Sequence, residues 1–155
     1  MKLREIYRLA QRYVPPAAAD RRLADSGPDS WWPAHEIGHF LVATQKECAA
    51  PKFGIDGYEL PDCTPARYRY VVAKEIAATS ISQRLLRRAG HGNLADEEIQ
   101  YTDETTLECS FERWCRSTVG RLLAQNRVTR LPTTACGLER LLARKTREVS
   151  AILRC

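Results

Sequence analysis

The residues best able to do chemistry lie in one short run, Trp31-Trp32-Pro33-Ala34-His35-Glu36-Ile37-Gly38-His39-Phe40. His35 and His39 are four residues apart, so on a helix both imidazoles lie on one face. That spacing suits two neutral nitrogen ligands of a zinc ion (Zn²⁺), and Glu36 suits a general base that takes a proton from a water molecule. Because the chain has only three histidines, the spacing favours a metal site over a chance match.

A buried helix is predicted to carry these residues. Pro33 suits the first turn of a helix, and Ile37, Phe40 and the residues after it continue an apolar pattern. Gly38 costs roughly 1 kcal/mol of helix propensity relative to alanine. Its place between the two histidines therefore indicates that another backbone or a substrate passes close to this point.

The third protein ligand is expected on a later helix, because the residue six positions after His39 is a glutamine rather than a histidine. Thr102 is typical of an N-cap, and it predicts a helix with Asp103 in its first turn. Asp103 then lies four residues before Leu107 and eight before Phe111, so helical geometry directs its carboxylate along the apolar face. A carboxylate that faces inward needs a partner, such as zinc. Asp103 is therefore the preferred third ligand.

Glu75 is the alternative third ligand. It lies in the middle of a helix predicted from the cap at Thr64-Pro65 to about residue 89. Small residues lie close to it at 77–80, which suits a glutamate that reaches across from a closely packed helix. The same position also suits a salt bridge to Lys74 or Arg67 on a solvated face.

The cysteines are expected to be reduced thiols. Their spacing is scattered, no Cys-x-x-Cys occurs, and nothing indicates secretion. Cys63 and Cys109 are minor alternatives as metal ligands, as is His91, which lies between two glycines and is more typical of a turn. The six cysteines are Cys48, Cys63, Cys109, Cys115, Cys136 and Cys155.

Length and composition predict one compact domain. The chain has 155 residues, of which 44% are hydrophobic, enough for a single core. Residues 1–30 are expected to form an N-terminal helix, over residues 2–14, and a linker, and residues 31–155 the functional domain. No apolar run reaches the roughly 20 residues of a membrane span, and no signal peptide is evident. A soluble, cytoplasmic protein without membrane contact is expected.

The predicted fold class is mainly α with a small β element. The only expected strand is residues 52–56, ahead of a turn at Gly57. Residues 91–101 are expected to be a polar connection with one helical turn at 94–99. Further helices are predicted from Thr102 to about residue 126 and from Leu138 to the C-terminus, joined by a loop at residues 127–137.

The net charge of +5 comes largely from arginines in three stretches, 84–88, 113–130 and 140–154. A basic balance favours acidic partners in general. These arginines alternate with helix-stripe leucines, and no aromatic residues interleave them as a stacking platform. A solvated helix face is the preferred interpretation, and nucleic acid is not an expected partner.

The run Ala34-His35-Glu36-Ile37-Gly38-His39-Phe40-Leu41-Val42-Ala43 resembles the peptidase domain of FtsH-type AAA proteases. In that family a short strand follows the motif helix, and an aspartate at the start of a further helix completes the zinc site. The resemblance covers roughly residues 30–125, places the strand at 52–56 and makes Asp103 the third ligand. The phosphate-binding loop of the ATPase is absent from this sequence. The resemblance therefore implies a free-standing peptidase domain, with a partner protein or unfoldase as a further expected partner.

A second, shorter resemblance is to ImmA/IrrE-type metallopeptidases. It rests on His35-Glu36-Ile37-Gly38-His39 together with Glu75-x-x-Ala78 as the motif of the third ligand. Both resemblances imply a zincin-like, helical metallopeptidase domain over residues 31–155, acting on a polypeptide substrate. The leading hypothesis is a zinc-dependent metalloendopeptidase with His35, His39 and Asp103 as ligands and Glu36 as base. The alternative is a non-catalytic, peptidase-like binding module that acts on a protein or nucleic acid through its basic helices.

Overall fold

The protein is mainly helical, as predicted. The computed structural model describes residues 1–14, 27–43, 65–106 and 112–150. No strand occurs in these ranges, and the predicted strand at 52–56 lies outside them. The described helices are α1 (Leu3–Tyr13), α3 (Trp32–Val42), α5 (Pro65–Arg88), α6 (Gly92–Thr106), α7 (Glu112–Gln125) and α8 (Ala135–Ser150).

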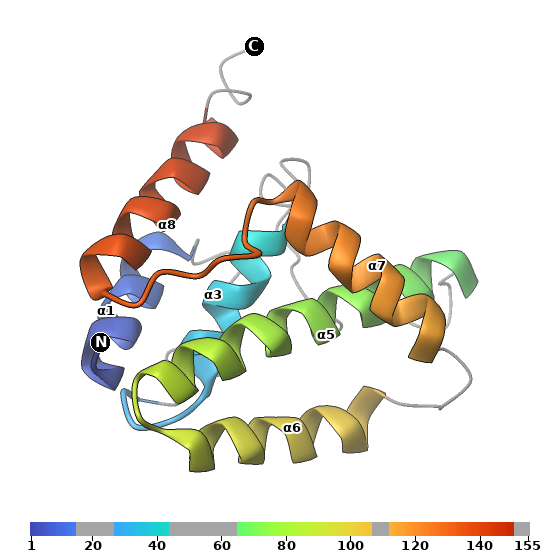
Figure 1. Ribbon diagram of the computed structural model, residues 1–155, viewed down its shortest axis with the longest axis horizontal. Helices are drawn as coiled ribbons and strands as arrows, with labels where there is room; N and C mark the ends of the chain where they lie inside the picture. Colours follow the sequence, from blue (N-terminus) through green and yellow to red (C-terminus); the bar gives the residue numbers. More distant parts are fainter. Residues whose placement is uncertain (15–26, 44–64, 107–111, 151–155) are drawn as a thin grey trace.

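Helix α3 forms the centre of the core. Every residue from Pro33 to Val42 is buried, and Ile37, Phe40 and Leu41 are each at most 2% exposed. Helix α3 lies between α1 and α5, which both pack against it (Figure 1). Burial of a large apolar side chain contributes roughly 1.5–3 kcal/mol. The motif helix is therefore a major source of stability as well as the carrier of the two histidines.

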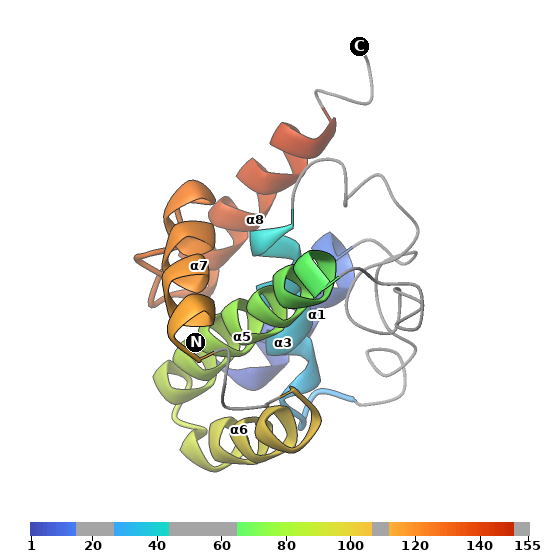
Figure 2. The ribbon, with the colours of Figure 1, turned by 90° about the vertical axis from the view of Figure 1, so that its right-hand side faces the viewer.

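Helix α5 is the longest element and packs against α3, α6 and α7. Figure 2 looks along α5 and shows α7 on one side of it and α6 below. Although α5 has 24 residues, none of the described helices combines the length and the apolar character that a membrane span requires.

The turn between α5 and α6 forms as the glycine pattern predicts. Gly90 adopts φ +85, a left-handed conformation that favours glycine. The N–H of Gly90 donates to the carbonyl of Arg87, and the N–H of His91 donates to that of Leu86. These two bonds satisfy carbonyl groups at the end of α5. His91 is thus a turn residue, and α6 folds back against α5.

The predicted boundary at Thr102 is wrong. Residues 92–106 form one continuous helix, so Thr102 and Asp103 lie near its C-terminal end and do not open a new helix. Leu94, Ala95 and Glu98 make a buried face that holds α6 against α5, and this packing outweighs the polar composition of the segment. The next described helix, α7, begins at Glu112.

Helix α8 closes the fold on the side of α1. Leu138 and Leu142 are fully buried in the core. Lys145 is also buried, and its ammonium group donates to the carbonyl oxygen of Ala43 at 2.6 Å and to Asn126 Oδ1 at 2.8 Å. Because Ala43 is the C-cap of α3, the positive charge lies where the helix dipole favours a cation. Lys145 therefore ties α8 to the ends of α3 and α7.

Candidate metal centre

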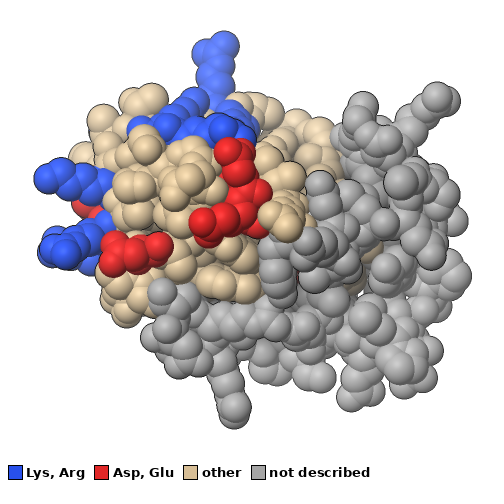
Figure 3. Space-filling view, turned by 90° about the horizontal axis from the view of Figure 1, so that it is seen from below, with Lys and Arg blue, Asp and Glu red and all other residues tan. Residues whose placement is uncertain are grey.

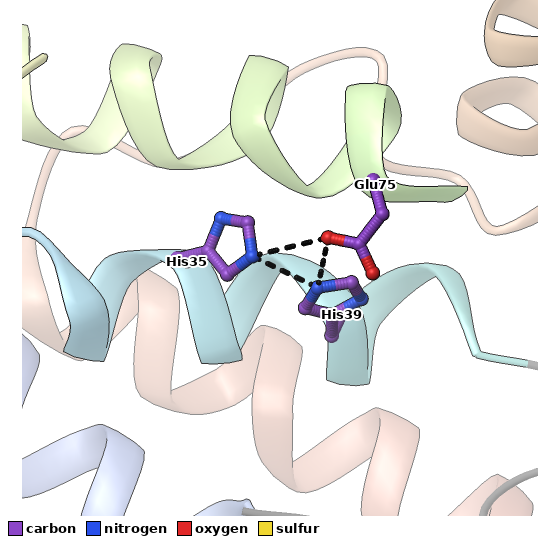
Figure 4. Close-up of side chains that lie close together, drawn as sticks. All are labelled: His35, His39 and Glu75. Atoms are coloured by element: carbon purple, nitrogen blue, oxygen red, sulfur yellow. Dashed lines mark hydrogen bonds and ion pairs between the residues drawn. The ribbon is translucent and has the colours of Figure 1, made fainter. Parts of the chain in front are cut away.

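Three potential ligand atoms converge between α3 and α5. His35 Nε2 and His39 Nε2 are 2.9 Å apart, and Glu75 Oε2 lies 3.0 Å from His39 Nε2 and 3.4 Å from His35 Nε2 (Figure 4). All three residues are buried. Figure 4 shows both imidazoles rising from α3 toward a glutamate that descends from α5. The structure therefore brings together the two predicted histidines and the alternative third ligand.

The site exists because the two helix backbones nearly touch. A Cβ atom added at Gly38 would lie 2.8 Å from the Cα of Ala78 and closer still to its carbonyl oxygen. Ala78 is three residues after Glu75 on α5, so it lies on the same face of that helix. The absence of a side chain at Gly38 thus lets Glu75 reach both histidines. The prediction that another backbone passes close to Gly38 is confirmed.

A second glutamate orients His35. Glu98, on α6, is completely buried, and its Oε1 accepts a hydrogen bond from His35 Nδ1 at 2.8 Å. With the proton held on Nδ1, the neutral ring has its lone pair on Nε2, which faces His39 and Glu75. A carboxylate behind a histidine in this way commonly supports metal ligation, since it fixes the tautomer and raises the basicity of the ring.

Aromatic packing holds the same imidazole from its other sides. The rings of Trp31 and Trp32 stack on each other with centroids 4.0 Å apart. Each of them also contacts the His35 ring edge-to-face. The distance between ring centroids is 5.5 Å for Trp31 and 5.7 Å for Trp32. These contacts restrict rotation of the His35 ring. Contacts within the protein therefore hold His35 in a defined orientation.

The charges of the metal-free site are strongly coupled. Burial alone would lower the pKa of His35, but hydrogen bonds to Glu75 and Glu98 raise it to about 10. Burial alone would raise the pKa of Glu75, but the two histidines hold it well below its usual range. Burial raises the pKa of Glu98, although the bond from His35 opposes this. Without a metal, a proton on His35 balances the negative charge of Glu75.

The chemistry of the donor set fits a zinc ion. Two imidazole nitrogens and one carboxylate oxygen are all ligands that zinc prefers. Tetrahedral bonds of roughly 2.0–2.2 Å would hold ligand atoms about 3.4 Å apart. The three distances here, 2.9, 3.0 and 3.4 Å, need an expansion of at most a few tenths of an ångström. Within the described residues the group has three members, which is typical of catalytic zinc sites that keep a fourth position open.

The other sequence candidates have different outcomes. Glu36 is buried on α3, three residues before His39, and residues at this spacing are neighbours on a helix surface. Asp103 lies near the end of α6, and its side chain is outside the described residues, so its role as a ligand stays a prediction. Cys63 and Cys109 also lie outside them.

Glu98 is the functional residue that sequence reasoning missed. The stretch from Gly92 to Gln100 is polar enough to resemble a connection. A signal was nonetheless present, because Leu94, Ala95 and Glu98 share one helical face. A glutamate in register with apolar residues is expected to be buried, and a buried carboxylate needs a partner.

Comparison of the chain with protein-family models, with curated proteins and with solved structures found no match. The geometry of His35, His39, Glu75 and Glu98 is therefore the basis for assigning chemistry to this chain.

The metal-free protein is expected to lose stability as the pH rises from 6.5 to 10. The raised pKa of His35 contributes stability that is complete below about 6.5, its value in the unfolded chain, and is lost as the pH passes through about 10. The loss is on the order of 5 kcal/mol, since the pKa of His35 rises from 6.5 to about 10 and each pKa unit corresponds to about 1.4 kcal/mol. Urea unfolding in a chelating buffer measures it. His35→Gln should flatten the profile, and an unchanged slope in that variant would refute the assignment.

Proposed function

We propose that this protein is a zinc-dependent metallopeptidase in which His35, His39 and Glu75 bind the ion and Glu36 is the general base. The observation that carries the proposal is the convergence of three buried ligand atoms around His-Glu-x-x-His. Support for Glu75 over Asp103 comes from its hydrogen-bonding contact with His39 and its proximity to His35. The arrangement favours the resemblance to ImmA/IrrE-type metallopeptidases, in which Glu75-x-x-Ala78 supplies the third ligand.

Zinc in such a site supplies Lewis acidity, which polarises the scissile carbonyl and lowers the pKa of water. The side chains of the protein orient the ligands and transfer the proton. Glu98 keeps the proton of His35 on Nδ1, so that Nε2 is available as a donor. The Glu36 carboxylate takes a proton from the attacking water and delivers it to the amide nitrogen as the peptide bond breaks. His39 and Glu75 complete the ligand set.

The experiment is zinc analysis combined with peptide hydrolysis. The purified chain is expected to contain about one zinc ion and to cleave an unfolded substrate such as denatured casein. Glu36→Gln should retain the metal and lower kcat by roughly 10²–10⁴-fold, because it removes only the general base. Glu97→Gln, the same change at an exposed position on α6, serves as the matched control and should leave both properties unchanged.

Two results would contradict the proposal. A chain that holds no zinc after refolding with the metal would exclude the site itself. A Glu36→Gln variant that hydrolyses the substrate as fast as the native protein would exclude Glu36 as the base, whatever its zinc content.

A further inference from the structure

Five arginines line a groove that shares no residue with the candidate metal centre. It lies against α8 and the loop that precedes it, and has a volume of about 550 Å³. Figure 1 shows the course of these two segments. Arg127 and Arg130 come from the loop, whereas Arg140, Arg144 and Arg147 come from α8. The groove brings arginines from two elements around one opening, which the sequence pattern of a single solvated helix face did not predict.

Few acidic side chains neutralise the positive charge of this groove. Among the described residues, its lining contains no aspartate or glutamate. Within the described part of the chain, only Arg144 of the five forms an ion pair, with Glu148 at 3.6 Å. The face seen from the side of α6 differs, because acidic and basic side chains lie next to one another there (Figure 3). The groove therefore has a higher density of positive charge than the face shown in Figure 3.

The loop that carries Arg127 and Arg130 is held in a defined conformation. Arg84 and Arg88 of α5 donate hydrogen bonds to the backbone carbonyls of Thr129 and Leu131. Arg127 itself has φ +55, a left-handed conformation at the end of α7 where glycine or asparagine is usual. An arginine at this position therefore retains a strain that glycine would avoid, as residues at binding sites often do.

We propose that this groove binds the phosphate backbone of double-stranded nucleic acid without regard to base sequence. From Arg140 to Arg147 the helix advances by about 10 Å. A duplex carries about six phosphate charges over that length, comparable with five guanidinium groups. An extended acidic peptide presents only about three residues over the same distance. Guanidinium groups also bind phosphate oxygens in a bidentate manner. The match of charge density thus favours a duplex over an acidic polypeptide.

The described residues that line the groove include no aromatic side chain, which bears on the kind of nucleic acid that it binds. Sites for single strands usually add aromatic side chains on which the bases stack. The apolar lining residues here include Leu131 and Leu141, whose side chains offer no such platform. Contacts to the backbone of a duplex need none. This proposal is independent of the zinc-dependent hydrolysis proposed above.

The test is fluorescence anisotropy of a 20-base-pair duplex of mixed sequence at several salt concentrations. If all five arginines contact phosphates, log K should fall against log salt with a slope of about −4.5, or roughly 500-fold between 50 and 200 mM. Arg140→Gln combined with Arg147→Gln should reduce the slope to about −2.7 and weaken binding at least ~10-fold at low salt. Arg4→Gln with Arg8→Gln removes the same charge from exposed positions on α1 and should leave the slope unchanged.

Three outcomes would overturn the proposal. One is no duplex binding at 50 mM salt. Another is an equal reduction of the slope of log K against log salt in both double variants. That result would show that the duplex is attracted to the positive surface in general and not to the groove. The third is preferential binding of poly-glutamate over the duplex, with only the former sensitive to Arg140 and Arg147, which would assign the groove to an acidic polypeptide. Circular dichroism of each variant verifies that it is folded.

Discussion

Replacing Glu75 with alanine is expected to lower the affinity for zinc by at least ~100-fold. The change removes one of three protein ligands, and each ligand contributes roughly 3 kcal/mol to binding at a zinc site. His35 stays in place, because it retains its bond to Glu98 and its packing against Trp31 and Trp32. Competition with a chromophoric chelator of known zinc affinity measures the change.

The zinc affinities of two further variants are to be compared with that of Glu75→Ala. Glu98→Ala should cost about 10–100-fold, as is usual for a residue that orients a ligand without touching the metal. Asp103→Ala should leave the affinity near that of the native protein. If Asp103→Ala weakens zinc binding more than Glu75→Ala does, the site is of the FtsH type and Glu75 has only a charge-balancing role.

Replacing Gly38 with alanine is expected to destabilise the protein and disable the metal site together. The added methyl group meets the backbone of Ala78, which cannot rotate away as a flexible side chain would. Helices α3 and α5 must then separate, at a cost of roughly 1–3 kcal/mol or more. Since the distance between these helices sets the reach of Glu75, zinc affinity should fall as well. Urea unfolding and chelator competition measure the two effects.

Gly120 offers a matched control for this variant. It lies within α7, and a Cβ atom added there meets no atom within 4 Å. Gly120→Ala should therefore stabilise the protein by roughly 0.5–1 kcal/mol through helix propensity alone and leave zinc binding unchanged. A Gly38→Ala variant that behaves like Gly120→Ala would show that the close helix contact has no role in the site.

The sequence predicted the parts of the site that depend on local spacing. The positions of His35 and His39 relative to each other follow from the pitch of one helix. The close approach at Gly38 was also predictable. A glycine inside a buried helix lowers the helix propensity, and close packing of a neighbouring segment against it is the gain that compensates for this cost. Likewise, Gly90 marked the end of α5 because its left-handed conformation disfavours other residues.

The parts that depend on packing between helices were harder to predict. The inward direction of Asp103 was derived for a helix that begins at Thr102, but α6 already begins at Gly92. That shift places Asp103 near the end of the helix and removes the basis of the derivation. The contact of Glu75 depends on how α5 crosses α3, which no periodicity within either helix reveals. The role of Glu98 was not predicted, because the polar composition of residues 92–100 indicated a connection. In the structure, the same residues form a helix whose one buried face includes Glu98.

The hydrogen bond between His35 and Glu98 has a consequence for how this protein can change over evolutionary time. Removing one partner of a buried polar pair costs roughly 3–5 kcal/mol, because the other is left without compensation. That is a large part of the 5–15 kcal/mol by which a typical domain is stable. A descendant therefore has to replace both residues nearly at once or retain both. The stability of the fold alone therefore constrains this pair, whatever the site binds.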